Sequence, residues 1–361
     1  MFELLGNAKK MLLKLFMLFS WGRRRCFVPR YNGMSQADIL YAFYDLAVSP
    51  ATFNIVEFLV PAEMERRRIG CHFLHVVIVP GPDNGFRADN FDTGYDVENK
   101  RWRLKNILVP SCWMFPSCNY VTVCASREEA MSIYSSVSKN IFPTDYNINY
   151  PVAHYGTIWI IKALSTQNVF PAIEASETAI TFAKEWISAH CINKKVITIT
   201  LRESTYELER NSDFSEWGRF LAFLDKSIYC PVIIRDTESA FKPLPKDLEV
   251  DGCPVFYEAP WNLEIRSAIY EISYLNMGVS NGPMIMCIMN QKARFQIFKL
   301  LNIACGIDKK HWMHFHGISS GENLPWCNNL QELVWEDDTF DVLKRSFLKM
   351  VNRIEKAENA C

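Results

Sequence analysis

Short runs of β-branched and apolar residues alternate along the chain with longer stretches whose apolar positions recur at helical spacing. This alternation is typical of parallel sheets covered by helices, and not of a sandwich or a helix bundle. Two such series are separated by residues 138–167, which lack clear periodicity and carry Pro143, Pro151 and Gly156. The pattern therefore predicts an α/β fold with two Rossmann-like domains, each a parallel sheet with helices on both faces.

The first series contains three runs that we interpret as strands and two stretches that we interpret as helices. Ser126 is suited to cap the second helix, because Glu128 and Glu129 then lie in its first turn, where the helix dipole favours acids. The strands are expected at 39–48, 74–79 and 120–124, and the first helix at 53–68.

The second series repeats the alternation and ends in an amphipathic helix. In the tail 338–354, Phe340, Leu343, Phe347 and Val351 share one face. The other helices are expected at 172–190, 215–225, 263–274 and 284–289, and the strands at 196–201, 232–234, 255–258, 276–279 and 295–298.

The N-terminal segment combines an apolar run with basic flanks. Residues 11–21 are apolar except for Lys14 and Ser20. Two lysines precede this run and three arginines follow it. The run is shorter than the roughly 20 apolar residues that a spanning helix needs, and no small-residue cleavage site precedes Arg23. We interpret residues 1–30 as a basic amphipathic arm that either lies at a membrane surface through residues 9–25 or packs on the body of the protein.

Composition and charge exclude some classes of partner. The 361 residues carry 39 Lys and Arg against 40 Asp and Glu, so no overall field draws in nucleic acid. The twelve Cys residues form no C-x-x-C pair, which indicates free thiols in a reducing, cytoplasmic compartment. His311, His314 and His316 match no common zinc spacing, so no metal is expected.

Polar residues directly follow the strands of the second series, at the edge where open parallel sheets bind ligands. Arg202 follows the strand 196–201, and a guanidinium suits a diphosphate because its planar fork can make two parallel hydrogen bonds. A solvated salt bridge is the alternative for Arg202 and for Arg210 in the loop beyond it. Asp236 and Thr237 follow the next strand, where the acid could contact a base or ribose or simply cap a tight turn.

Two further groups lie after later strands. Glu258 could hold ribose hydroxyls, just before a helix that Asn262 is suited to cap. The turn Ser280-Asn281-Gly282-Pro283 precedes the apolar run 284–289. Gly282 permits close backbone approach, Pro283 suits a first helical position, and free amides at a helix start attract anions, so a phosphate would fit there.

These strand ends resemble the donor domain of GT-B glycosyltransferases, notably the bacterial fucosyltransferase-like and heptosyltransferase-like groups. The resemblance covers about residues 190–300 and rests on Leu201-Arg202, on Ile234 to Thr237, and on Gly278 to Pro283. The Asp-Thr-Gly turn typical of heptosyltransferases is replaced by Ser280-Asn281-Gly282. The resemblance implies two facing domains and transfer of a sugar from a nucleotide-diphosphate donor to a glycan, lipid-linked or other hydroxyl acceptor, as in polysaccharide biosynthesis.

In such enzymes an Arg and a helix N-terminus stabilise the departing nucleotide, which assigns these roles to Arg202 and residues 280–283. No Asp-x-Asp metal motif occurs, and no cofactor is expected. The fucosyltransferase likeness makes GDP the first nucleotide to consider. An inverting enzyme also needs a base in the first half, for which Asp45 and His154 are candidates beside Asp83 and Asp92. On the loop 81–95, Gly85 and Arg87 are the acceptor-side candidates.

The sequence thus predicts four parts. They are a basic arm at 1–30, an acceptor-side α/β domain at 31–165, a nucleotide-sugar-binding α/β domain at 166–335 and a closing helix at 336–361. A sugar-nucleotide epimerase or hydrolase of the same fold is the alternative enzyme, since it would share the donor residues. A non-catalytic scaffold is the alternative outside enzymes.

Overall fold

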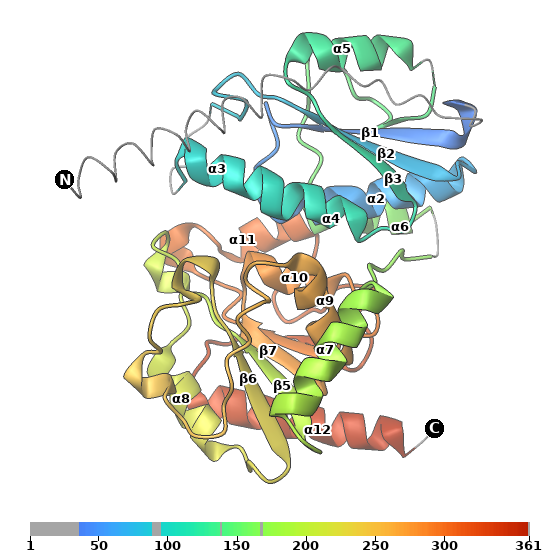
Figure 1. Cartoon of the computed structure of the whole chain (residues 1–361). Coiled ribbons are helices and arrows are strands. Elements are labelled where there is room, and N and C mark those ends of the chain that lie inside the picture. The colour runs from blue at the N-terminus through green and yellow to red at the C-terminus, as the bar shows by residue number, and fades with distance from the viewer. Residues whose placement is uncertain (1–35, 89–94, 138, 167–168, 360–361) are drawn as a thin grey trace, which may run out of the picture.

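The computed structural model describes residues 36–88, 95–137, 139–166 and 169–359, and the arm predicted at 1–30 lies outside them. Two separate sheets, each with parallel neighbours throughout, lie one in each half of the chain. Figure 1 shows the halves stacked on each other, with helices on both faces of each sheet. The predicted fold class, two facing α/β domains with parallel sheets, is therefore confirmed.

The first sheet has the strand order β3-β2-β1-β4. In Figure 1, α5 covers the face away from the second half, and α2, α4 and α6 cover the face toward it. The strands are β1 (Ile39–Asp45), β2 (Phe73–Val79), β3 (Cys118–Val123) and β4 (Ile141–Phe142). The helices are α2 (Asn54–Arg68), α3 (Val97–Arg103), α4 (Val109–Trp113), α5 (Arg127–Ser136) and α6 (Thr157–Leu164). The 3-10 turn η1 (Gln36–Asp38) precedes β1, and the π-helical segment η3 (Leu104–Leu108) joins α3 to α4.

The second sheet has the order β6-β5-β7-β8-β9. Its strands are β5 (Lys195–Thr200), β6 (Tyr229–Ile234), β7 (Leu275–Val279), β8 (Phe295–Phe298) and β9 (Gln331–Leu333). Its helices are α7 (Glu177–His190), α8 (Phe214–Phe223), α9 (Leu263–Ile272), α10 (Ile285–Ile288), α11 (Lys309–His311) and α12 (Phe340–Glu358). The shorter turns are η4 (Leu208–Arg210), η5 (Thr237–Ser239), η6 (Lys246–Leu248), η7 (Gly282–Met284), η8 (Ile303–Cys305) and η9 (Trp312–His316).

Side-chain caps fix where several helices begin. Ser126, Ser176, Asp213 and Asn262 each accept a hydrogen bond from the backbone N–H three residues further on, as predicted for Ser126 and Asn262. The cap at Ser176 explains why α7 starts at Glu177 and not at the expected residue 172. Each cap joins residues three apart in the chain, so the sequence alone can predict it.

Other expectations were wrong in detail. Residues 255–258 form no strand, since only Val255 bridges Ile233 beside β6. The region 138–167, expected to be irregular, contains β4 and α6, and the helices α3 and α4 were missed because polar residues interrupt their apolar pattern. The tail helix begins at Phe340 and not at residue 338, because Asp338 accepts hydrogen bonds from the Trp217 indole and the Asp213 backbone.

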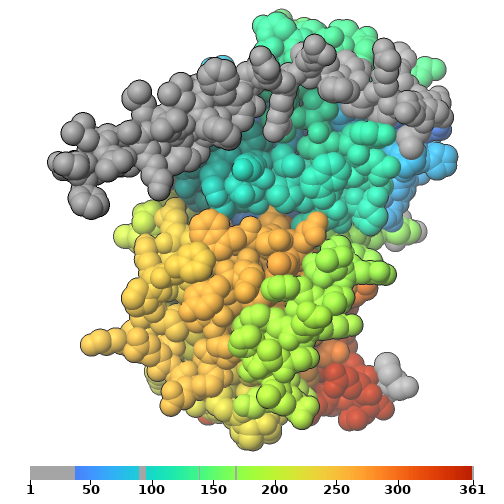
Figure 2. Space-filling view, viewed as in Figure 1, coloured from blue at the N-terminus to red at the C-terminus, as the bar shows by residue number. Residues whose placement is uncertain are grey.

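The two halves share an apolar core. One cluster of buried side chains runs from β1 and α2 of the first half to β6, α9 and α10 of the second. A second cluster lies on the other face of the second sheet, beneath α8 and α12. Because burial of apolar surface is the main stabilising term, this continuous core holds the halves against each other. In Figure 2 the two halves meet along a seam without a break on the visible face.

Candidate functional site

The carboxyl ends of both sheets meet at the seam between the halves. Phe53 lies between the end of β1 and the start of α2, and Gly282 follows β7. A Cβ on Gly282 would lie 2.6 Å from Cδ2 of Phe53, so the aromatic ring packs directly on the glycine backbone. The turn 280–283, predicted to bind phosphate, therefore lies where the first half contacts the second.

The turn 280–283 presents polar groups to this seam. The Asn281 side chain accepts a hydrogen bond from the Met284 backbone at 3.2 Å, and its buried Nδ2 donates to no described atom. The carbonyl of Ser280 accepts from Nη2 of Arg210 at 3.5 Å, and Pro283 occupies one of the first two positions of η7. The helix behind the turn is short, because α10 has only four residues, so its dipole adds less than the sequence suggested.

Arg202 is placed differently from the expectation. Its guanidinium donates to the carbonyls of Tyr206 and Glu207 and to the Asn211 side chain, all in the loop that follows β5. Burial, the largest cause, and the charge of Arg210 both lower the pKa of Arg202. Arg202 thus orders its own loop, and Arg210 is the arginine of this loop that reaches the turn 280–283.

Residues at the end of β6 form a buried charged group. Asp236 accepts a hydrogen bond from the Glu203 backbone at 2.6 Å, and burial raises the pKa of its carboxyl. Glu203 pairs with Arg235, which leaves both of these charges satisfied. Arg266 of α9 lies close enough to lower the pKa of Asp236, and its Nε donates to the Ala259 carbonyl at 2.9 Å. The buried Nη1 of Arg266 has no described partner.

The loop from β6 to α9 carries the other predicted donor residues. Thr237 donates to the Pro260 carbonyl at 3.0 Å, which joins both ends of this loop. Oε2 of Glu258 is buried and has no described partner, although the residue as a whole is half-buried. Asn262 caps α9 through its side chain, as expected. The structure therefore brings Glu258, Arg266 and Asn281, each with an unpaired polar atom, to the carboxyl edge of one sheet.

Asp45 does not fit its predicted role as a base. Its two carboxylate oxygens accept hydrogen bonds from both Nη atoms of Arg127 at 2.9 and 3.0 Å, and Oδ2 also accepts from the Tyr146 hydroxyl at 2.8 Å. The residue is 3% exposed. Asp45 is thus one member of a buried ion pair that joins the end of β1 to the start of α5, and its oxygens are occupied.

His154 does not fit this role either. Its ring stacks on Trp159 with centroids 3.9 Å apart and meets the edge of Phe142. Burial lowers the pKa of His154 to about 4, so the imidazole is neutral at pH 7 and a poor proton acceptor.

Of the acceptor-side candidates, Arg87 is buried and donates to the Tyr155 hydroxyl at 3.2 Å. Gly85 adopts a φ of 92° in a tight turn, where its carbonyl accepts from Gly81. Glycine suits this left-handed conformation, which explains Gly85 through the turn and not through a ligand. Asp92 lies outside the described residues.

Glu57 is a residue at the seam that sequence reasoning missed. It lies in the first turn of α2 and is 5% exposed. Oε2 accepts from the Asn54 side chain at 2.8 Å, and the carboxylate also accepts from the Gly156 backbone. Burial raises the pKa of Glu57 to about 7. An acid in the first turn of a helix is common, so no local signal in the sequence distinguishes Glu57. Arg266 was also missed, because no local signal distinguishes an arginine within a helix.

The His group lies beside the seam. Thr157 donates to the His316 carbonyl at 3.1 Å, and burial lowers the pKa of His316 to about 3. Over the described ranges, no group of three or more His, Cys, Asp or Glu residues could hold a metal ion. Nor does any described helix combine the length and apolar character needed to cross a membrane.

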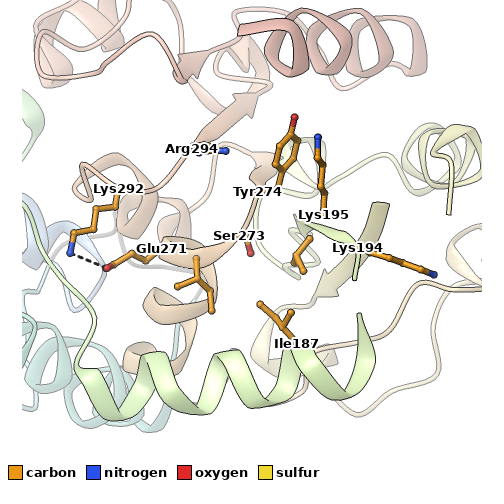
Figure 3. Close-up of a pocket in the computed structure, with 10 residues that line it drawn as sticks. Ile187, Lys194, Lys195, Glu271, Ser273, Tyr274, Lys292 and Arg294 are labelled. Carbon is orange, nitrogen blue, oxygen red and sulfur yellow. Dashed lines mark hydrogen bonds and ion pairs between the residues drawn. The ribbon is translucent and has the colours of Figure 1, made fainter. Parts of the chain in front are cut away.

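A cavity of about 350 Å³ lies away from this edge, where β5, β7 and β8 begin. Figure 3 shows that Lys194, Lys195 and Lys292, which line it, point in different directions. Lys292 pairs with Glu271, and the Lys195 ammonium lies 4.7 Å from the Tyr274 ring centroid. Because the three lysines do not converge and two of them have partners, we do not assign a ligand to this cavity.

No protein-family model matches the chain, and no curated protein matches its sequence. Several solved structures are similar to it. A family 9 glycosyl transferase from Veillonella parvula is 12% identical, with a TM-score of 0.46, over 86% of this chain and 89% of that one. The ADP-heptose LPS heptosyltransferase II of E. coli is 9% identical, with a TM-score of 0.47, over 89% and 99%.

The UDP-GlcNAc 2-epimerase from Neisseria meningitidis, solved with UDP-GlcNAc, is 12% identical, with a TM-score of 0.39, over 89% of this chain and 93% of that one. All three TM-scores lie below 0.5, and the structures include both transferases and an epimerase. The likeness therefore does not by itself decide the activity of this chain, and the functional argument rests on its own residues.

Proposed function

We propose that the chain is a glycosyltransferase that binds a nucleotide-diphosphate sugar at the carboxyl edge of its second sheet. The sugar is transferred to a glycan or lipid-linked hydroxyl acceptor held by the first half. The observation that carries the proposal is the convergence of the carboxyl ends of both sheets at the Phe53–Gly282 contact. A donor bound at this edge lies against the half that presents the acceptor, as group transfer requires.

The unpaired polar atoms support this position for the donor. Buried polar groups in proteins are almost always hydrogen-bonded, so three unpaired atoms at one sheet edge favour a ligand there. Glu258 can accept hydrogen bonds from ribose hydroxyls. Arg210, Arg266 and the Asn281 amide can donate to a diphosphate, which gives electrostatic stabilisation of the leaving nucleotide without a metal. GDP is the first nucleotide to test, on the resemblance stated above.

Calorimetric titration with GDP, UDP, ADP and CMP tests the proposal. We expect wild type to bind one nucleoside diphosphate selectively, and Glu258→Gln to bind it about tenfold more weakly, since the replaced oxygen can no longer accept from a hydroxyl. Glu264→Gln, an exposed acid on α9, is the control and should bind as wild type does. Arg202→Ala is less informative, because it would disrupt its loop.

Absence of binding for all four nucleotides by wild type would refute the donor site. Equal binding by wild type and Glu258→Gln would leave the proposed activity standing but show that Glu258 does not contribute to nucleotide binding.

A further inference from the structure

Three large aromatic side chains are exposed next to the proposed donor site. Phe241 is 73% exposed, Tyr257 47% and Trp261 46%. Isolated exposed apolar residues are common, but contiguous exposed patches on soluble proteins mark surfaces that something covers.

The three rings form one stack. The Phe241 ring lies 5.9 Å from that of Tyr257 with an interplanar angle of 5°, and 5.9 Å from that of Trp261 with an angle of 20°. Trp102 of α3 meets the Trp261 ring edge-on at 6.2 Å, so the first half supports one end of the stack. Near-parallel planar rings are suited to receive another planar group.

The stack belongs to the same loops as the predicted donor residues. Tyr257 directly precedes Glu258, whose Oε2 is buried without a described partner. The backbone of Trp261 donates to the Glu258 carbonyl at 3.1 Å, and Phe241 follows the turn η5 that begins with Thr237. Tyr257 and Trp261 are therefore within three residues of the Glu258 carboxylate that we assign to the ribose.

We propose that the stack formed by Phe241, Tyr257 and Trp261 binds the nucleobase of the donor. This inference rests on the proposed function and extends it from the ribose and phosphates to the base. A nucleotide with its ribose at Glu258 carries its base one glycosidic bond away, within reach of the flanking rings. Every base has an aromatic face, and stacking on protein rings contributes to affinity whatever its hydrogen-bonding edge.

The chemistry of the stack also predicts its selectivity. Phe241 has no polar atom, Trp261 offers only an indole N–H and Tyr257 only a hydroxyl, so the stack has few groups that read the edge of a base. Discrimination then follows stacking area, and purine nucleotides should bind more tightly than pyrimidine nucleotides.

Titration of two variants with GDP, UDP and inorganic pyrophosphate tests the inference. Phe241→Ala and Trp261→Ala should each weaken GDP binding by about tenfold, with a smaller loss for UDP, and should leave pyrophosphate binding unchanged. Phe182→Ala removes a partly exposed ring of α7 as a matched control and should bind all three as wild type does. Phe241 is exposed enough for its variant to fold, which thermal unfolding would verify.

The outcomes are distinct. GDP binding that is unchanged in both variants overturns the stacking site and leaves the donor site intact. An equal loss of affinity for GDP and for pyrophosphate also overturns the stacking site, because the variants would then disturb the whole carboxyl edge of the second sheet. If wild type binds neither pyrophosphate nor any of GDP, UDP, ADP and CMP, the proposed function fails and the stacking site fails with it.

Discussion

At the residue scale, burial decides which charged side chains remain available for chemistry. Asp45 and Glu57 both lie near the carboxyl end of β1 and both are buried. Asp45 has the Arg127 guanidinium as its partner, whereas the hydrogen-bond donors to Glu57, Asn54 and Gly156, are neutral. An unpaired carboxylate in a poorly solvated site binds its proton more tightly, which explains the raised pKa of Glu57.

The raised pKa of Glu57 makes stability depend on pH. The folded state holds the proton up to about pH 7, whereas the unfolded chain releases it near 4.5, so the contribution of Glu57 to the free energy of unfolding should fall as pH rises between these values. The size of the effect is on the order of 3 kcal/mol. Glu57→Gln should remove this dependence and be more stable than wild type at pH 8, as measured by urea unfolding at several pH values.

Only the difference between wild type and Glu57→Gln isolates the contribution of Glu57. Burial lowers the pKa of the neighbouring His154 and His316 to about 4 or below, so these two groups make stability rise with pH up to about 6.5, opposite in sign to Glu57. Glu65→Gln, on the same helix, removes an acid that pairs with Arg68 and should change stability by less than about 1 kcal/mol. A stability difference between wild type and Glu57→Gln that does not change from pH 4.5 to 7 would contradict the account.

At the element scale, α12 shows how an amphipathic pattern becomes a packed helix. Phe347 is buried, with its ring 5.6 Å from that of Phe220 in α8 and 5.3 Å from that of Tyr229 in β6. Its neighbour Leu348 is half exposed. The sequence predicted the buried face correctly, because a helix that covers a sheet buries one stripe of side chains.

Alanine substitutions on α12 should separate these two faces. Phe347→Ala leaves a cavity between α12, α8 and β6, and we expect a loss of about 3–5 kcal/mol in the free energy of unfolding. Leu348→Ala, the adjacent control, should cost less than about 1 kcal/mol, since little of its side chain is removed from contact with protein. Comparable losses in both variants, measured by denaturant unfolding, would show that α12 does not pack as described.

At the scale of the whole molecule, the two halves are held by close packing at the seam. Gly282 contacts the Phe53 ring, and a Cβ on Gly156 would lie 2.7 Å from the Phe315 carbonyl oxygen. Both glycines therefore let segments from different halves approach more closely than other residues allow. The polar turn 280–283 is positioned against the first half by this packing and not by a salt bridge.

Gly282→Ala tests this arrangement. The added methyl group overlaps Phe53, and we expect a destabilisation of about 1–3 kcal/mol together with separation of the halves, seen as a larger radius of gyration in small-angle scattering. Combining it with Phe53→Ala should recover part of the loss, because the two residues are in direct contact. Additive losses in the double variant would place the strain elsewhere than at this contact.

The local order of strands, helices and caps was largely determined by the sequence alone. β-branched runs, apolar periodicity and capping side chains act over a few residues, so β5, β8, α2 and the caps at Ser126 and Asn262 were predicted correctly. The elements α3, α4 and β9 were not, because polar residues interrupt the apolar pattern of the two helices and β9 has only three residues.

Only the tertiary structure decided what each polar side chain does. Arg127 and Asp45 are 82 residues apart in the chain, and so no sequence pattern pairs them. The same holds for the burial of Glu57 and for the contact between Trp102 and Trp261. Electrostatic free energy depends on through-space distance and on exclusion of water, and both are set when the halves close on each other.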